Sequence, residues 1–321
     1  MIPNNFTKIN KESNSEFESS LEENVQIYEY VKAANPKISQ IPVKVHRSTD
    51  YKKSRTSIIP FDLSNDLNTL YKATSPNLLA SFIKIIENDE LEIKSNNLSS
   101  QLFYIIEGYG KCNILNDGII NYYQGDMLVL SNINVTFRAT TDTMIYWVND
   151  SPLLNYLNLK SNNRNFYHLL IRSENMLSAI NSVVNQENNE NKNRLGILLG
   201  NPSTDSIKGT GTLTLTPILW SLLNIIPPNT VQKPHRHNSV ALDLCVCAPT
   251  KGVYTLMGPE LDDSGNVKDP IRCEWESGSV FVTPPGWWHS HHNDTNEPGW
   301  VLPIQDAGLY TYMRTLDIQF T

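Results

Sequence analysis

The chain has 321 residues, of which 40% are hydrophobic, so it is long enough to fill the cores of two domains of ordinary size. Its 26 Lys plus Arg stand against 33 Asp plus Glu, a formal charge of -7. No Lys/Arg cluster is dense enough to form a phosphate-binding face, which argues against a nucleic-acid partner.

The N-terminal part of the chain is polar. Residues 1–40 begin with MIPNNFTKINKESNSEFESS and show little periodicity, which predicts a mobile tail with a short helix near Val25 to Ala33. This start lacks the apolar core of a signal peptide, and no run of about 18 apolar residues occurs anywhere. We therefore expect a cytoplasmic protein with no membrane partner.

Short β-type runs broken by turn residues fill two parts of the chain. In residues 41–152 they include QLFYIIEG, DMLVL and TMIYWV, and in residues 206–321 they include ILWSLLNIIP, ALDLCVCA and SVFVTPP. Residues 153–205 between them carry apolar residues at helical spacing, as in NFYHLLIRSENMLSAINSVV. The pattern predicts a mainly β fold of two antiparallel barrels joined by a short helical connector.

The two β-rich parts also repeat one another. QLFYIIEGYGKCNI followed by QGDMLVL parallels ALDLCVCAPTKGVYTL followed by SGSVFVTPP, which indicates a duplicated barrel. Four cysteines show no disulfide-type spacing, and we interpret them as buried thiols: Cys112, Cys245, Cys247 and Cys273.

Histidines are grouped in the second β-rich part. In PHRH, His235 and His237 are two residues apart, so on a strand both imidazoles point to the same face. In GSVFVTPPGWWHSHHND, His289 follows a Pro-Pro-Gly turn that can bring it beside the neighbouring strand. Three neutral imidazoles are what a facial metal site needs, so we expect a metal here.

These two stretches resemble the paired signatures of the cupin superfamily, whose fold is a double-stranded β-helix, or jelly-roll, barrel. The second stretch fits closely, with Gly278, Pro284, Gly286, His289 and Asn293 at the signature spacing. The resemblance implies that the chain is a bicupin with a metal site on three histidines: His235, His237 and His289.

One branch of the superfamily matches better than the rest. The run from Thr212 to Phe320 resembles the metal-bearing cupin of the gentisate 1,2-dioxygenase family, which includes salicylate and 1-hydroxy-2-naphthoate dioxygenases. These ring-cleaving bicupins hold Fe(II) on three histidines without the usual cupin Glu, and here Ala241 and Leu242 stand in that place. The family usually carries its metal in the first cupin, whereas this site falls in the second.

The first β-rich part lacks a comparable ligand set. Aligned with the cupin pattern, it offers Lys94, Asn96 or Asn97 in place of histidines, Gln101 in place of the Glu, and Thr136 in place of the last histidine. We expect a degenerate, metal-free cupin in residues 41–152 that serves packing, an oligomer interface or one wall of the pocket.

Asp243 and His291 are the candidate catalytic residues. Asp243 follows Ala241 and Leu242 where the family continues with an Arg, and a carboxylate there would favour a cationic or hydroxyl-bearing substrate over an anionic one. It could equally be a solvated rim residue or a partner of Arg236 or Arg272. His291 shares a strand face with His289 and can bond substrate or orient a ligand, whereas His292 should face away.

The resemblance implies a non-heme Fe(II) dioxygenase that cleaves an aromatic or related small substrate, bound to the metal through two oxygens, with O₂. It also implies a homo-oligomer. Two alternatives stay open. One is a metal-dependent cupin lyase or isomerase that uses Zn, Mn or Ni as a Lewis acid. The other is a non-catalytic bicupin that binds a metal or a small molecule.

Overall fold

The computed structural model describes residues 15–53, 55–162, 164–185, 194–204 and 211–321. The chain divides into two compact units, Met1–Ser39 and Gln40–Thr321. The first unit holds α1 (Glu16–Glu23), capped by the Ser15 hydroxyl, and α2 (Tyr30–Ala33), capped by the Glu29 carboxylate. The helix α2 lies in the range where a short helix was predicted, whereas α1 was not predicted.

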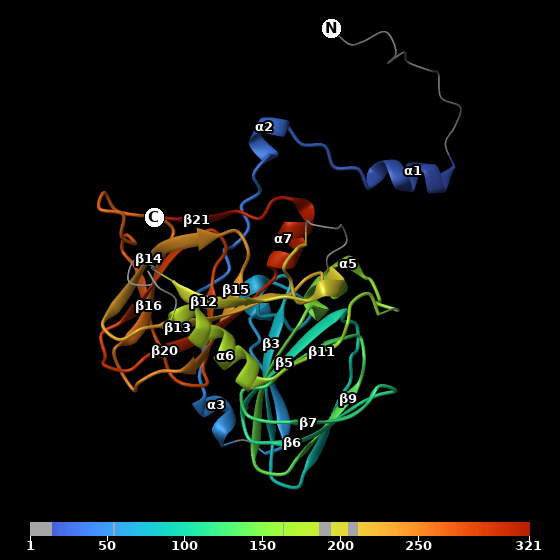
Figure 1. The fold of residues 1–321 in the computed structure, drawn as a ribbon. Coiled ribbons are helices and arrows are strands. Elements are labelled where there is room, and N and C mark those ends of the chain that lie inside the picture. Colours follow the sequence, from blue (N-terminus) through green and yellow to red (C-terminus); the bar gives the residue numbers. More distant parts are fainter. Residues whose placement is uncertain (1–14, 54, 163, 186–193, 205–210) are drawn as a thin grey trace. The chain divides into compact units, whose positions relative to one another are not determined.

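The second unit begins with a barrel of two antiparallel sheets, drawn in cyan to green in Figure 1. Its larger sheet has the strand order β11-β8-β5-β10-β3-β2 and its smaller sheet the order β4-β9-β6-β7. The strands are β2 (Ser57–Pro60), β3 (Leu79–Ile85), β4 (Glu90–Ile93), β5 (Ser100–Glu107), β6 (Gly110–Ile114), β7 (Gly118–Tyr122), β8 (Met127–Ser131), β9 (Val135–Ala139), β10 (Thr143–Asn149) and β11 (Leu169–Ile171).

A second barrel, drawn in yellow to red apart from β1, repeats this plan. Its sheets have the orders β1-β18-β15-β20-β13-β12 and β17-β16-β19-β14-β21. The strands are β1 (Val45–His46), β12 (Leu195–Leu199), β13 (Trp220–Ile226), β14 (Thr230–His237), β15 (Ala241–Cys247), β16 (Val253–Gly258), β17 (Ile271–Glu274), β18 (Val280–Thr283), β19 (Trp288–Asn293), β20 (Gly299–Gln305) and β21 (Ile318–Phe320).

The two barrels share one strand order, since β8-β5-β10-β3 in the first corresponds to β18-β15-β20-β13 in the second. This confirms the predicted mainly β fold with two cupin barrels. Helices are few and mostly short: α3 (Thr49–Lys52), α4 (Ser64–Leu67), α5 (Ser151–Leu157), α6 (Ser173–Val184), the 3₁₀ turn η2 (Pro202–Thr204) and α7 (Ala307–Met313). Among the described residues, no helix has the length and apolar character to cross a bilayer.

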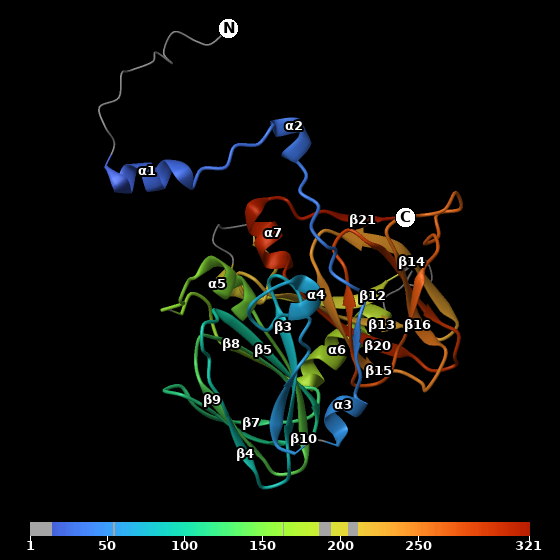
Figure 2. The ribbon, with the colours of Figure 1, turned by 180° about the vertical axis from the view of Figure 1, so that it is seen from behind.

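Some strands join a barrel other than the one that their place in the chain suggests. β1 precedes the first barrel but pairs with β18 of the second, with Val45 opposite Phe281. The predicted connector, 153–205, holds α6 and two strands, of which β11 pairs with β8 and β12 with β13. These pairings do not test the predicted segment limits, 1–40, 41–152, 153–205 and 206–321, which stay a prediction. Figure 2 shows the same unit from behind, with α6 between strands of both barrels.

The main core lies between the larger sheets of the two barrels. Along β10, Tyr146 and Val148 pack into this shared core, while Ile145 and Trp147 point into the first barrel. Leu242 and other β15 and β20 residues reach the shared core from the second barrel. Both faces of these sheets are therefore buried, which explains why the central strands read as continuous apolar runs.

The cysteines are all free thiols. Cys112, Cys245 and Cys273 are buried as predicted, but Cys247 is exposed. The prediction was wrong for Cys247 because the pairing of β15 with β20 shifts register between Cys245 and Cys247. This irregularity lies at the end of the strand, where side chains leave the core.

Candidate metal centre

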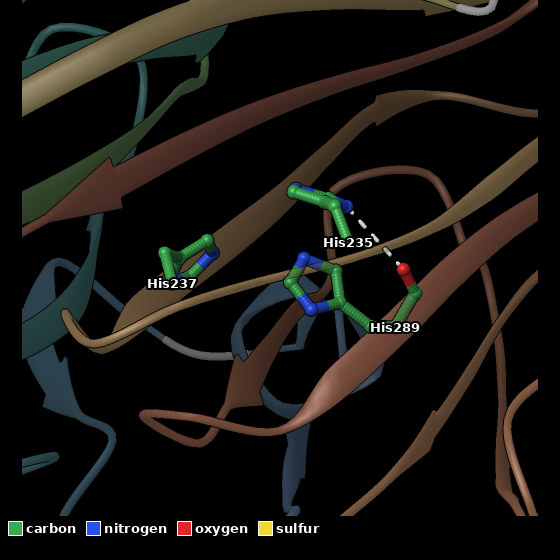
Figure 3. Close-up of side chains that lie close together, drawn as sticks. All are labelled: His235, His237 and His289. Carbon is green, nitrogen blue, oxygen red and sulfur yellow. Dashed lines mark hydrogen bonds between the residues drawn. The ribbon is translucent and has the colours of Figure 1, made fainter. Parts of the chain in front are cut away.

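Two neighbouring strands bring the three predicted histidines together. β14 carries His235 and His237, and β19 carries His289 directly opposite His235. One nitrogen of each ring lies within 4.8 Å of the corresponding nitrogens of the other two rings. Figure 3 shows the three rings turned toward a common point.

The turn before β19 fixes the position of His289. Gly286 has a φ of 75°, a left-handed conformation that favours glycine, and its N–H donates to the carbonyl of His237 over 2.7 Å. This bond ties the Pro-Pro-Gly turn to the strand that carries the other two histidines. The turn therefore does what its sequence predicted.

Backbone carbonyls orient all three rings in the same sense. The Nδ1 atoms of His235, His237 and His289 lie 3.3, 2.8 and 3.1 Å from the carbonyls of His289, Ser239 and Trp287. A carbonyl only accepts, so each Nδ1 carries the proton and each Nε2 keeps a free lone pair. Three Nε2 lone pairs that converge are a donor set that fits a divalent transition metal.

Burial keeps these imidazoles neutral. It lowers the pKa of His237 to about 4 and holds the pKa values of His235 and His289 well below their ordinary 6.5. Neutral imidazole is the form that coordinates a metal, so the three side chains are ready to bind at neutral pH. Metal binding by these residues stays a prediction.

His291 lies in the same pocket but has the opposite tautomer. The Trp275 indole N–H donates to Thr255 Oγ1 over 2.8 Å, and Thr255 Oγ1 lies 2.9 Å from His291 Nδ1. In the described residues this buried hydroxyl has no other acceptor, so its proton goes to Nδ1 and His291 carries its own proton on Nε2. Burial lowers the pKa of His291 to about 3, so the ring is a neutral donor. Sequence reasoning placed His291 on the correct face but missed Thr255 and Trp275.

His292 points elsewhere, as the strand alternation predicted. Its ring stacks on Tyr254 at 4.8 Å, and its Nε2 lies 2.8 Å from the Ser290 hydroxyl. It is half-buried and does not line the pocket.

Asp243 is a buried pocket residue, so the alternatives of a solvated rim or a partner for an arginine were wrong. Thr283 Oγ1 donates to its Oδ2 over 2.5 Å, while Arg236 bonds Gln319 and Arg272 bonds Glu274. Burial raises the pKa of Asp243 to about 7. The carboxyl therefore exchanges between charged and neutral forms near neutral pH, which the sequence did not suggest.

A cavity of about 260 Å³ adjoins the histidines and is lined by His235, His237, His289, His291 and Asp243. Its other walls are mostly apolar: Ile197, Leu198, Trp220, Leu222, Pro303, Ile318 and Phe320. The volume lies just below the roughly 300–1,000 Å³ of sites for drug-sized ligands, so a ligand with one small ring fits best.

Arg194 is the pocket residue that sequence reasoning missed. It precedes β12, and its Nη2 donates to the carbonyl of Lys233 over 2.6 Å while its guanidinium lies 5.3 Å from the centre of the Phe320 ring. Burial lowers its pKa to about 10, which leaves it cationic at neutral pH. It follows an Asn/Glu/Lys tract with no motif, and only the pairing of β12 with β13 brings it to the pocket.

In the first barrel, the residues that align with the cupin ligand positions lie in different surroundings. Lys94 and Asn96 are exposed, and Thr136 is half-buried. The buried Gln101 amide donates to the carbonyls of Ser131 and Ile133 over 2.9 and 2.8 Å. Gln101 thus holds a turn of its own barrel, and the expectation of a metal-free first barrel stays a prediction.

One curated protein and several solved structures are similar to this chain, whereas no family model matches it. A curated gentisate 1,2-dioxygenase from Ralstonia sp is 27% identical over 125 residues, which are 39% of this chain and 30% of that relative. The match therefore spans less than a third of the relative's length.

Solved structures match over both barrels. A salicylate 1,2-dioxygenase from Pseudaminobacter salicylatoxidans superposes with a TM-score of 0.71 and 12% identity, over 94% of this chain and 95% of that one. A variant of that enzyme in complex with gentisate gives 0.70 and 13%, over 98% of both chains. The fold is thus that of a two-barrel cupin. Among cupins it is the gentisate dioxygenase-like fold that the sequence signatures predicted.

Proposed function

We propose that the chain is a non-heme metal-dependent dioxygenase of the ring-cleaving type, with Fe(II) held by His235, His237 and His289. The observation that carries this proposal is the close approach of three ring nitrogens, one from each histidine and all within 4.8 Å of one another, at the edge of a mostly apolar pocket. Fe(II) agrees with this donor set, and Zn, Mn or Ni are the alternative ions.

The ligand number suits this chemistry. Among the described residues, the cluster of possible metal ligands contains these three histidines alone. Three protein ligands would leave an Fe(II) ion with positions for substrate oxygens and O₂, and the ion would supply the transfer of electron density that ring cleavage by O₂ needs. Both oxygen atoms enter the product while one ring C–C bond breaks, so no further reductant is needed.

The protein's own residues supply orientation and a dry site. His291 presents an Nε2–H donor to an oxygen of the bound substrate or of O₂, because Thr255 occupies its other nitrogen. The walls formed by Trp220, Leu222 and Phe320 exclude water and hold a flat ring. Asp243 and Arg194 add one acidic and one basic group to this surface.

Oxygen uptake tests the proposal. The protein is loaded anaerobically with Fe(II) and mixed with O₂ and a panel of gentisate, salicylate, 1-hydroxy-2-naphthoate and amine-bearing analogues. We expect uptake with at least one member, together with loss of bound iron and of activity in His289→Ala. His292→Ala is the matched control, since it removes a histidine from the same strand but outside the pocket, and it should keep both.

Fully metallated protein that binds a panel member without consuming O₂ would contradict the proposal. Turnover without O₂ would then indicate the lyase or isomerase, for which Asp243 with its pKa of about 7 is a suitable acid or base. Binding without turnover would indicate the non-catalytic bicupin. A homo-oligomer and a cytoplasmic location stay predictions, and sedimentation velocity tests the first.

A further inference from the structure

The pocket beside the three histidines contains two oppositely charged groups that do not pair with each other. Arg194 and Asp243 both line it, and no ion pair joins them or joins Arg194 to any other carboxylate in the part of the chain that the structure describes. Buried charges are costly unless they are paired. Two such groups in one ligand-sized cavity indicate a ligand that complements both.

Arg194 is prepared to bind an anion. Its guanidinium is held by the carbonyl of Lys233 and, at 3.5 Å, by Gln232 Oε1, and it lies over the Phe320 ring. A guanidinium has five N–H donors in a planar fork, so donors remain that can bind a carboxylate in the pocket. The fixed position reduces the entropy that would be lost on binding.

Asp243 is prepared to bind a hydrogen-bond donor. Thr283 occupies its Oδ2, and Oδ1 accepts no hydrogen bond from any described residue. The side chain is only 3% exposed, so a ligand atom in the cavity is the available partner for Oδ1. An N–H group suits this oxygen whether or not the carboxyl is charged, because Oδ1 accepts in the ionised form and keeps acceptor capacity in the neutral form.

Arg194 and Asp243 line the same cavity but are not bonded to each other. Arg194 donates to the carbonyl of Lys233, and Asp243 accepts from Thr283. A single small ring with substituents at separate positions can reach both.

We propose that the substrate is a ring acid with a carboxylate that binds Arg194 and an amino group, at another ring position, that binds Asp243. Amino-substituted hydroxybenzoates are the simplest members of this class. The inference rests on the proposed function, since it places this ligand at the same metal-binding histidines. It also replaces the expectation, based on Asp243 alone, that the pocket disfavours anionic substrates.

Calorimetric titration of Zn(II)-loaded protein under anaerobic conditions tests the ligand class without requiring turnover. The probes are 5-amino-, 5-methyl- and 5-hydroxy-2-hydroxybenzoate, with the 3- and 4-amino isomers and 2-aminophenol. We expect the best amino-substituted isomer to bind at least about tenfold tighter than the methyl compound, since the methyl group is of similar size but cannot donate a hydrogen bond. In Asp243→Ala, the amino and methyl compounds should bind equally.

Arg194→Met should weaken every carboxylate probe at least about tenfold and leave 2-aminophenol, which has no carboxylate, unchanged. Arg272→Met is the matched control, because Arg272 lies on the surface over Tyr254 and bonds Glu274. It should leave all affinities unchanged. Zinc content and circular dichroism of each variant separate a lost contact from a lost fold.

The result also separates this inference from the proposed function. The expected affinities with no oxygen uptake by the Fe(II) protein would support the ligand class and overturn the dioxygenase. Oxygen uptake with equal affinity for the amino and methyl compounds, or with tighter binding of the hydroxy compound, would overturn the ligand class and keep the dioxygenase. Unchanged carboxylate affinity in Arg194→Met would also overturn the ligand class.

Discussion

At the scale of single residues, the site separates its histidines by tautomer. Backbone carbonyls hold the proton on Nδ1 of His235, His237 and His289, whereas the Thr255 hydroxyl holds it on Nε2 of His291. Four imidazoles in one pocket therefore do two different things: three present lone pairs, and one presents a proton. A second, buried hydrogen bond from Trp275 fixes the direction of the Thr255 hydroxyl.

Thr255→Val tests this assignment, because it removes the hydroxyl but nearly keeps the side-chain shape. We expect kcat to fall about 10–100-fold with metal content unchanged, since His291 loses the partner that fixes its tautomer. Thr255→Ser, which keeps the hydroxyl, should retain most of the activity. Steady-state kinetics with metal analysis measure both effects, and a valine variant that loses its metal instead would show that Thr255 supports the ligands themselves.

Strand periodicity explains which of these residues the sequence could predict. Residues two apart on a strand share a face, and this rule placed His235 with His237 and His289 with His291. It could not place Arg194, because β12 reaches the second barrel only through its pairing with β13. It also could not tell that Asp243 is buried, because that depends on the second sheet of its own barrel, whose strands β14 and β19 face Asp243 across the cavity.

At the scale of elements, the Asp306 carboxyl links the end of β20 to the loop that follows His237. Asp306 lies between β20 and α7, and it accepts hydrogen bonds from the Val240 N–H at 3.0 Å and from Asn77 of the first barrel at 2.7 Å. Asp150 does the same between β10 and α5, where it accepts from the Ser99 and Ser100 N–H groups. In each barrel, a buried aspartate thus accepts backbone hydrogen bonds near the start of a central strand, β5 in the first barrel and β15 in the second.

Burial makes the Asp306 link sensitive to pH. It raises the pKa of this carboxyl from 3.8 to about 6, so the folded state binds the proton more tightly than the unfolded state. The resulting stability is present below pH 3.8 and is lost as the pH rises toward 6. Asp306→Asn keeps an acceptor for Val240 and cannot ionise.

The free energy of unfolding of Asp306→Asn, relative to the wild type, should therefore rise by up to about 3 kcal/mol between pH 4 and pH 7. Urea unfolding at several pH values measures this difference, in which the other titrating groups cancel. A difference that stays flat across this range would show that Asp306 keeps an ordinary pKa in the folded protein.

At the scale of the whole second unit, the barrels share their largest core. Tyr146 of the first barrel packs with Leu242 of the second and donates a hydrogen bond to its carbonyl over 3.3 Å. The N-terminal β1 pairs with β18 of the second barrel, and the α6 residues Met176 and Ile180 belong to the same core. Neither barrel buries its larger sheet without the other, so we expect both to unfold together.

Leu102→Ala tests this coupling from the first barrel. Leu102 is fully buried in the shared core, so its truncation should lower the free energy of unfolding by about 2–5 kcal/mol. Five of the six tryptophans follow residue 219, so tryptophan fluorescence reports mainly on the second barrel. If the barrels are coupled, the fluorescence and circular dichroism transitions shift together in urea. The exposed Leu115→Ala control should shift neither, and a fluorescence transition that does not move in Leu102→Ala would mean that the second barrel folds by itself.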